Sequence, residues 1–147
     1  MNIRLRPAEN EDLAILDRIH RQNMRSYVEQ NYQWNDNLFK NNFVSKDYVV
    51  MLQELEIIGF IKLVAPTKSS SQDTVCLYLG EIQIKSTYQN QGIGTKILKS
   101  IIEKNHGKYP CIWLRVLKGN PAIRLYKRLG FGVFAATQTH YKMQLIF

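Results

Sequence analysis

The sequence predicts a mixed α/β (α+β) fold formed by one domain that spans residues 1–147. The chain of 147 residues is long enough to bury a core and is no longer than one ordinary domain. Apolar residues make up 45% of it and charged residues 22%, which is typical of a folded globular chain. Short strand-like runs alternate with stretches in which apolar residues recur at helical spacing, and no linker or internal repeat interrupts them.

The N-terminal part is predicted to contain a strand followed by two helices. Ile3–Arg6 alternates apolar and charged residues before Pro7 ends the run, which is typical of a short strand. Asn10 is a suitable cap for a helix whose apolar residues continue at helical spacing towards Val28. Leu38–Phe43 carries further apolar residues that predict a second, shorter helix.

The central part is predicted to contain three strands. Tyr48–Gln53 and Ile57–Val64 are expected to form a hairpin that turns around Glu54–Glu56. Thr74–Ile84 is rich in β-branched and aromatic residues and predicts a long strand. Between the hairpin and this strand, Pro66–Asp73 is rich in Ser and Lys, which predicts a loop.

The C-terminal part is predicted to alternate helices and strands. From Ile93 to Ile102, apolar residues recur at helical spacing with charged residues between them, which indicates an amphipathic helix. Cys111–Val116 predicts a strand, and Asn120–Pro121 opens another helix with a capping side chain followed by proline. Phe131–Ala136 and His140–Phe147 are expected to close the chain as a hairpin.

Composition and charge narrow the class of protein. Twenty Lys and Arg residues against twelve Asp and Glu give a net charge of +8, which indicates a basic solvated surface or an anionic partner such as nucleic acid or a phosphorylated cofactor. No apolar run approaches the ~20 residues of a membrane helix and no secretory signal is visible, so a cytoplasmic location is expected. Cys76 and Cys111 are expected to be small buried side chains rather than a reactive pair, and no metal site is predicted.

The most informative stretch is a glycine-containing turn that joins a strand to a helix, Ile82–Thr95. The first turn of a helix has backbone N–H groups without a partner in the helix, and its dipole is positive there, so it suits a pyrophosphate. Gly92 and Gly94 lack a Cβ, which lets phosphates approach the backbone, and Lys96 adds positive charge. The third glycine of a dinucleotide-binding fingerprint and the Gly-Lys-Ser/Thr of a P-loop are absent.

Two motifs together resemble a known family. Gln89-x-x-Gly92-x-Gly94 is followed by the run Asn120–Phe131, which contains Asn-Pro-Ala, Leu-Tyr and Leu-Gly-Phe. At this spacing the pair resembles the acetyl-CoA loop and the later helix of the GNAT superfamily of N-acetyltransferases, in its small single-domain bacterial type. The resemblance implies a mixed, mostly antiparallel central sheet of about seven strands, splayed into a V-shaped cleft and flanked by about four helices.

The resemblance implies acetyl-CoA (coenzyme A) as the cofactor. Backbone groups of Ile82, Gln83 and Ile84 would hold the pantetheine arm, and one N–H would polarise the thioester carbonyl. Asn120 would contact the same arm, although capping the helix is a sufficient reason for an asparagine there. The residues implied to bind the pyrophosphate or shape its loop are Gln89, Asn90, Gln91, Gly92, Ile93, Gly94 and Thr95.

The resemblance also implies a proton donor, whereas it leaves the proton acceptor open. Tyr126 would face the coenzyme sulfur and protonate the departing thiolate, with half-buried packing as the alternative role. Arg115 stands where some relatives place a carboxylate base. Glu81 is the next candidate base, with a solvated strand residue as the alternative, and His140 or a water chain are further possibilities.

The acceptor amine is expected to bind between the loop after the first helix and the terminal strands. Two aromatic rings and a carboxylate would form a wall for an amine, and simple packing of the loop is the alternative for Tyr32 and Trp34. The candidate substrate-binding residues are Glu29, Tyr32, Trp34, Arg115, His140 and Tyr141.

These observations predict an acetyl-CoA-dependent N-acetyltransferase in which a primary amine of a small molecule or peptide attacks the thioester directly. Two alternatives are an acyl-CoA-binding sensor module without turnover and an acetyltransferase that acts on an RNA-linked amine. The anionic cofactor already accounts for basic residues near its site, so a nucleic-acid partner is not expected. A membrane partner is not expected either, whereas a homodimer is compatible with the resemblance.

Overall fold

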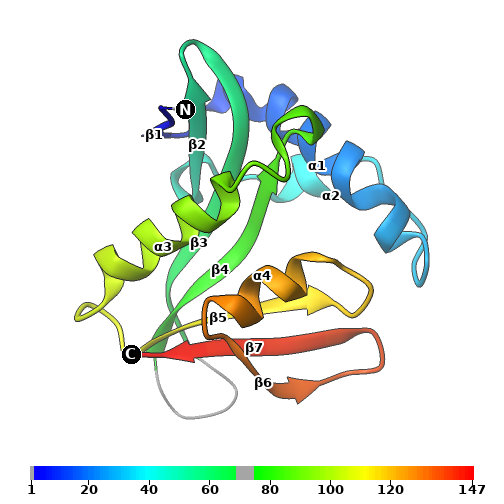
Figure 1. The fold of residues 1–147 in the computed structure, drawn as a ribbon. Helices are drawn as coiled ribbons and strands as arrows, with labels where there is room; N and C mark the ends of the chain where they lie inside the picture. Colours follow the sequence, from blue (N-terminus) through cyan, green and yellow to red (C-terminus); the bar gives the residue numbers. More distant parts are fainter. Residues whose placement is uncertain (1, 69–74) are drawn as a thin grey trace. The chain divides into compact units, whose positions relative to one another are not determined.

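The computed structural model describes residues 2–68 and 75–147 (Figure 1). Within these residues the chain forms seven strands and four α-helices, which confirms the predicted mixed class. The α-helices are α1 (Leu13–Val28), α2 (Leu38–Asn42), α3 (Ile93–Asn105) and α4 (Ala122–Arg128). The strands are β1 (Arg4–Pro7), β2 (Tyr48–Gln53), β3 (Glu56–Lys68), β4 (Val75–Ile84), β5 (Cys111–Leu117), β6 (Gly132–Ala136) and β7 (His140–Ile146). Short 3-10 turns are η1 (Asn10–Asp12), η2 (Ser45–Asp47) and η3 (Ser86–Tyr88).

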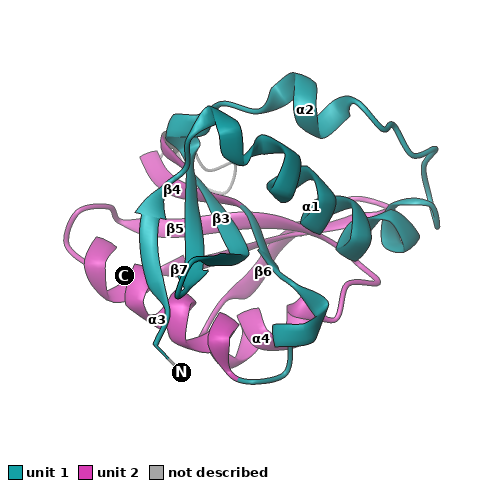
Figure 2. Cartoon of the chain, turned by 90° about the horizontal axis from the view of Figure 1, so that it is seen from above, with its two compact units in different colours: residues 1–63, 81–91 teal, residues 64–80, 92–147 magenta. Residues whose placement is uncertain are grey.

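The strands follow the order β1-β2-β3-β4-β5-β7-β6 in a mixed sheet. β4 and β5 are parallel, whereas β1–β2, β2–β3, β5–β7 and β6–β7 are antiparallel, as predicted for a mostly antiparallel sheet. The chain divides into two compact units, unit 1 with Met1–Leu63 and Glu81–Gln91, and unit 2 with Val64–Gly80 and Gly92–Phe147 (Figure 2). Each unit therefore holds a part of the sheet. The prediction that the chain is a single domain with a splayed cleft stays a prediction.

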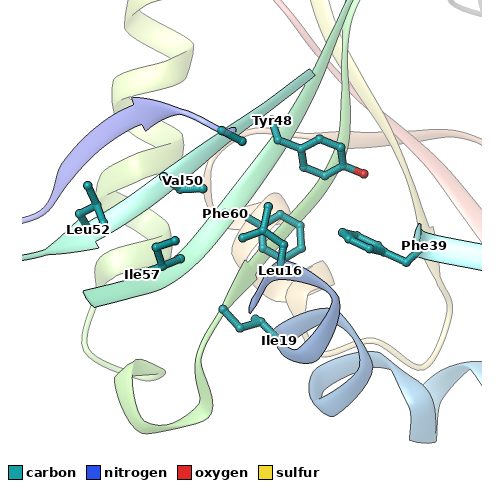
Figure 3. Close-up of a cluster of buried hydrophobic side chains, with 9 residues drawn as sticks. Leu16, Ile19, Phe39, Tyr48, Val50, Leu52, Ile57 and Phe60 are labelled. Atoms are coloured by element: carbon teal, nitrogen blue, oxygen red, sulfur yellow. The ribbon is translucent and has the colours of Figure 1, made fainter. Parts of the chain in front are cut away.

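The core of unit 1 is formed by α1, α2, β2 and β3 (Figure 3). α1 contributes the buried side chains of Leu16 and Ile19, whose spacing places them on one face of the helix. Phe39 of α2 packs its ring against those of Tyr48 and Phe60, with 5.8 Å between ring centroids in each pair. This packing holds α1 against the strands of unit 1, so the polar side chains on the same helix have defined positions.

The start of α1 differs from the prediction, which made Asn10 its cap. Asn10 instead belongs to η1, and the Asp12 carboxylate accepts the backbone N–H of Glu9 at 2.8 Å. Asp12 also accepts two hydrogen bonds from the guanidinium of Arg6, from Nη1 to Oδ2 at 2.8 Å and from Nη2 to Oδ1 at 3.1 Å. Asp12 is buried, and these bonds satisfy its charge, so the chain enters the helix through a 3-10 turn held by Asp12.

The hairpin of β2 and β3 forms as predicted, with Gln53 paired to Glu56 across the turn. Glu54 has a φ of 54°, the left-handed conformation that the tight turn requires. β3 continues past Val64 to Lys68, so the predicted loop is wrong for residues 66–68, which extend the strand instead. The rest of that predicted loop, residues 69–73, lies outside the described residues.

Unit 2 buries apolar side chains on α3, on strands β5 and β7, and on residues 76–79 of β4. α3 buries Ile93, Ile97, Leu98 and Ile101, the residues whose spacing predicted the helix. Met143 of β7 is also fully buried. α4 ends before Gly130, which has a φ of 100°, the left-handed conformation that a residue after a helix often adopts.

Cys76 and Cys111 form a disulfide, which corrects the expectation of two separate buried thiols. Parallel pairing of Leu77 with Ile112 places the two preceding residues opposite each other, with 5.0 Å between their Cα atoms. The apolar pattern of each strand predicts the strand but not its register, so the pairing could not be predicted. Disulfides are rare in the cytoplasm, and this bond therefore gives no support to the predicted location.

Among the described residues, no helix combines the length and the apolar character that crossing a bilayer requires. The same residues hold no cluster of three or more His, Cys, Asp or Glu side chains placed to bind a metal ion.

Candidate active site

The predicted pyrophosphate turn has a backbone shaped for close approach. Asn90 has a φ of 62° and Gly92 a φ of 80°, so two residues of the turn adopt the left-handed conformation. The N–H of Lys96 donates to the carbonyl of Gly92 at 3.1 Å, so the N–H groups of residues 93–95 precede the first helical hydrogen bond of α3. A Cβ placed on Gly92 would meet no atom within 4 Å, which shows that space is open beside this backbone.

Side chains stabilise the same turn. Nε2 of Gln89 donates to the carbonyl of Ile84 at 2.8 Å, and Nε2 of Gln91 donates to the carbonyl of Thr87 at 3.1 Å. In unit 2, Arg128 of α4 donates to Oγ1 of Thr95 at 3.5 Å. That contact brings a guanidinium to the first turn of α3, where it adds to the positive end of the helix dipole.

The end of β4 presents two different edges. The N–H of Lys85 donates to the carbonyl of Ile58 in β3 at 2.8 Å, so backbone groups of alternate residues face β3. The backbone groups of Ile82 and Ile84 therefore face the other edge. The carbonyl of Ile84 accepts hydrogen bonds from Nδ2 of Asn23 at 2.9 Å and from Nε2 of Gln89 at 2.8 Å, and a role of Ile82, Gln83 or Ile84 towards the cofactor stays a prediction.

Glu81 is joined to a residue that the sequence did not single out. Nδ1 of His20, on α1, is hydrogen-bonded to Oε2 of Glu81, on β4. The same carboxylate oxygen accepts Nε2 of Gln83 at 3.0 Å. His20 and Glu81 expose only 21% and 16% of their side chains, so the solvated role that was the alternative for Glu81 does not describe its position.

A chain of amide side chains continues from this pair to the turn. Nδ2 of Asn23 donates to Oε1 of Gln83 at 3.0 Å, and Nε2 of Gln89 lies 3.4 Å from Oδ1 of Asn23. We call the five residues His20, Asn23, Glu81, Gln83 and Gln89 the α1–β4 network. Gln83 is buried, and each donor in the chain has its acceptor, so the side chains fix one another's orientation.

Aromatic rings surround the His20 end of the network. The imidazole stacks on Phe39, with 4.7 Å between centroids, and on Trp34, with 5.6 Å. Nε1 of Trp34 donates to Oδ1 of Asp36 at 2.9 Å. Burial, followed by the charge of Glu81, raises the pKa of Tyr48 well above its ordinary value, so this phenol stays neutral.

The predicted acceptor residues of unit 1 have different surroundings. Trp34 contacts the α1–β4 network, and Tyr32 exposes 49% of its surface. Glu29 forms an ion pair with Arg25 at 3.3 Å, one turn earlier on the helix. Of the three, Trp34 is the one that the structure brings next to Glu81 through His20.

The predicted acceptor residues of unit 2 lie on β5 and β7. Arg115 is exposed, and strand pairing places Lys142 opposite it, while Tyr141 pairs with Val116. Burial and the nearby Arg115 guanidinium lower the pKa of His140, in that order of importance. His140 is therefore biased towards its neutral form, and Thr139 Oγ1 lies 2.8 Å from its Nδ1.

Of the two site residues predicted at α4, Tyr126 is buried and Asn120 caps the helix. Tyr126 is 7% exposed, and its ring lies 5.9 Å from that of Phe131. Oδ1 of Asn120 accepts the N–H of Ala122 at 2.9 Å, so this side chain caps the helix as the sequence indicated. A role towards the cofactor, for either residue, stays a prediction.

His20 and Asn23 are the site residues that sequence reasoning missed. The available signal was positional: Leu16, His20 and Asn23 fall at intervals of four and three, on one face of α1. A histidine and an asparagine that share a face with a core leucine are held close to whatever that face packs against. This pattern does not indicate a function for either side chain unless it is known that the helix face packs against β4.

Comparison with known proteins bears on the identity of the chain. A spermine/spermidine N(1)-acetyltransferase of Bacillus subtilis is 29% identical over 136 residues, which cover 89% of this chain and 88% of the relative. A crystal structure from Pyrococcus horikoshii matches with a TM-score of 0.83 and 18% identity, over 99% of each chain. The PaiA N-acetyltransferase of Thermoplasma acidophilum, in complex with coenzyme A, matches with a TM-score of 0.78 and 17% identity, over 100% of each chain.

The structural likenesses confirm the fold that the sequence predicted. The model of the acetyltransferase (GNAT) family matches residues 13–131, which is most of the chain. The match includes the glycine turn, α4 and the α1–β4 network. The chain therefore belongs to the GNAT family of acetyltransferases and is an N-acetyltransferase.

Proposed function

We propose that the protein transfers an acetyl group from acetyl-CoA to a primary amine of a polyamine-like small molecule. The observation that carries the donor is the turn before α3, where residues 93–95 offer N–H groups beside open space at Gly92. Anions bind at such helix starts because the unpaired N–H groups and the dipole both favour negative charge. Arg128 at Thr95 supplies a cation to the same place, so the residues present fit a pyrophosphate.

Acetyl-CoA, when bound, supplies an acetyl group already activated as a thioester. The backbone N–H of Ile82 would donate to the carbonyl oxygen of that group and stabilise the charge that develops on it. Tyr126 would give its phenolic proton to the departing sulfur. Asn120 would keep α4, and with it Tyr126, in place by capping the helix.

Charge and aromatic surface in unit 1 support an amine with several cationic groups. Glu81 lies at the His20 end of the α1–β4 network, and Asp36 is held by the indole of Trp34. Aromatic faces attract ammonium groups and pack against methylene chains, and carboxylates neutralise the cations. The relative from Bacillus subtilis, at 29% identity, carries the name of an enzyme that acetylates spermine and spermidine. The net charge of +8 would slow the approach of a polycation, so the recognition must be local.

The test is a panel of acceptors with acetyl-CoA and the purified protein. Spermidine, spermine, an amino sugar, a free amino acid and a peptide with a free N-terminus are each incubated, and the acetylated product is identified by mass spectrometry. We expect spermidine or spermine to have a kcat/KM at least about tenfold above the other classes. A peptide as the best acceptor would overturn the polyamine assignment. Tight coenzyme A binding without any acetylated product would instead favour a sensor module.

The remaining assignments of location and partners belong to the same proposal. We infer a cytoplasmic protein whose acceptor is a small amine and which takes no nucleic acid as a partner. The basic side chains of α3 and α4 would serve the anionic cofactor, which accounts for part of the positive charge. We also propose a homodimer, and size-exclusion chromatography with light scattering would measure the molar mass that tests it.

A further inference from the structure

We propose that His20 takes the proton from the acceptor amine and that Glu81 is a positioning residue that orients it. This inference rests on the proposed function, because it assigns a role within amine acetylation. Nothing in the sequence motifs points to His20, and the inference comes from its contacts. His20 lies on α1, and the carboxylate that it contacts is on the strand whose next residue, Ile82, would bind the thioester.

The contact between the two side chains sets which ring nitrogen carries the proton. A carboxylate can only accept a hydrogen bond, so Nδ1 of His20 must be the donor to Oε2 of Glu81. In the neutral imidazole this leaves Nε2 with its lone pair, ready to accept a proton. Within residues 2–68 and 75–147, His20 forms its hydrogen bond and ion pair with Glu81 alone, through Nδ1. Within the same residues, Nε2 therefore has no hydrogen bond that would have to break before it accepts a proton.

The surroundings of the ring hold this orientation. Phe39 and Trp34 contact the imidazole by stacking, at 4.7 and 5.6 Å between centroids. The charged group that faces the ring is Glu81, and the other elements packed against it, α2 and the loop before it, contribute apolar rings. About a fifth of the His20 side chain remains exposed, at 21%, so a small amine or one water molecule can reach it.

Glu81 is arranged to orient the imidazole of His20. Its Oε2 atom accepts two hydrogen bonds, from His20 and from Gln83 at 3.0 Å. Both bonds end on the same oxygen, so the carboxylate is held in one orientation towards the imidazole. Gln83 is in turn fixed by Asn23 at 3.0 Å, so the carboxylate is held as a fixed acceptor for the imidazole. Other enzymes use a carboxylate in this way, to orient a histidine that moves the proton.

The proposed step transfers one acetyl group and two protons. The neutral amine nitrogen forms a bond to the thioester carbonyl carbon, and Nε2 of His20 removes one proton from that nitrogen, directly or through one water. The carbon–sulfur bond breaks, and the sulfur leaves with the electron pair and takes the phenolic proton of Tyr126. The products are the N-acetylated amine and the free thiol. The imidazolium formed at His20 is stabilised by Glu81 and then returns its proton to solvent, from which Tyr126 is reprotonated.

The kinetic test uses a substitution that separates positioning from proton transfer. In His20→Asn, the side-chain Nδ2 occupies the place of Nδ1 and can still donate to Glu81, but no nitrogen remains to accept a proton. Acetylated spermidine is measured at saturating acetyl-CoA. We expect kcat to fall by about 100-fold or more, with KM for the amine changed by less than about threefold. Glu81→Gln keeps an acceptor for Nδ1–H, and we expect a smaller loss of about tenfold.

His106→Asn is the matched control, because it makes the same chemical change at an exposed position after α3. We expect this variant to keep the wild-type kcat. Circular dichroism of all variants checks that each one folds. An unchanged kcat in His20→Asn would overturn the proposal.

A second readout needs neither acetyl-CoA nor turnover. The 15N chemical shifts of the imidazole in the free wild-type protein show which nitrogen carries the proton when the ring is neutral. We expect the proton on Nδ1 of His20, and a proton on Nε2 instead would overturn the proposal even if His20→Asn is inactive. A wild-type protein that acetylates none of the amines would overturn the proposed function itself. Normal activity in His20→Asn would overturn only the role of His20.

Discussion

His20 and Glu81 are hydrogen-bonded although 61 positions separate them in the sequence. One lies on α1 and the other on β4, and the core side chains Leu16 and Ile19 hold that helix in unit 1. The polar pair therefore depends on the apolar packing beside it. Mutations that loosen the core of unit 1 are expected to reduce activity as well as stability.

Gly59→Ala tests the close approach of β3 and β4 beside the network. A Cβ at residue 59 would lie 2.4 Å from the carbonyl oxygen of Gln83 and 3.0 Å from Sδ of Met51, so the strands must separate. We expect the free energy of unfolding, measured with urea, to fall by about 1–3 kcal/mol. Gly132→Ala is the control, since a Cβ there meets nothing within 4 Å, and its effect should stay within about 0.5 kcal/mol. Equal losses in both variants would contradict this explanation.

Gly92→Ala tests the left-handed conformation in the pyrophosphate turn. A Cβ at residue 92 has open space around it, so the cost comes from the φ of 80° and is expected to be about 1 kcal/mol. Relief of that strain would turn the N–H groups of residues 93–95 away from the phosphates. We expect calorimetry to show about tenfold weaker coenzyme A binding, the equivalent of about 1.4 kcal/mol.

Gly107→Ala is the matched control for the turn. Gly107 has a φ of 94° and equally open surroundings, but it follows the other end of α3. It should lose a similar free energy of unfolding while its affinity for coenzyme A is unchanged. If Gly107→Ala weakens binding as much as Gly92→Ala does, the turn has no special role.

Asp12→Asn tests the ion pair that replaces the predicted cap of α1. The hydrogen bond from Arg6 holds the pKa of Asp12 below its ordinary value, and the N–H of Glu9 acts in the same direction. Because the folded-state pKa is the lower one, the charged carboxylate stabilises the protein above the unfolded-state pKa. That stabilisation is lost as the pH falls through the folded-state pKa.

We expect Asp12→Asn to lower the free energy of unfolding at about pH 7 by about 1–3 kcal/mol. The difference from the wild type should shrink as the pH falls below the ordinary pKa of an aspartate and through the lowered folded-state pKa of Asp12, because the carboxylate is then protonated in both states. Glu11→Gln, at an exposed residue of the same turn, should change little at either pH. A difference for Asp12→Asn that stays constant with pH would show that the carboxylate charge is not the cause.

Tyr126→Phe tests the proton donor. The side chain is 7% exposed and packs near Phe131, so phenylalanine keeps the packing and removes only the hydroxyl. We expect kcat to fall by about 100-fold while the Kd for coenzyme A changes by less than about twofold. Tyr109→Phe should leave both unchanged. A normal kcat at saturating substrate would remove Tyr126 from the chemistry.

The sequence predicted the elements of the fold well where the period was clear. The spacing of Ile93, Ile97, Leu98 and Ile101 predicted α3, and alternation with turn residues predicted the hairpin of β2 and β3. Errors arose where contacts between particular side chains decided the outcome, and these contacts leave no period in the sequence. Arg6 and Glu9 made Asp12 the residue that organises the start of α1, and strand register paired the two cysteines.

The candidate site likewise has one part with a local sequence pattern and another part that has none. The residues of the glycine turn are contiguous, so their pattern alone could predict an anion site. The α1–β4 network joins Asn23 to Gln83 and His20 to Glu81, and no local pattern shows which helix face meets which strand. The contacts of the acceptor side therefore needed the structure, whereas the donor side could be proposed from the sequence and stays a prediction.

The central claim is that the backbone amides at the start of α3 bind the pyrophosphate of coenzyme A. Titration of coenzyme A into 15N-labelled protein, followed by amide NMR spectra, tests it most directly. We expect the largest shifts at Gly92, Ile93, Gly94 and Thr95, with the amides after Gly107 unaffected. Saturable binding that leaves those four amides unshifted would contradict the account.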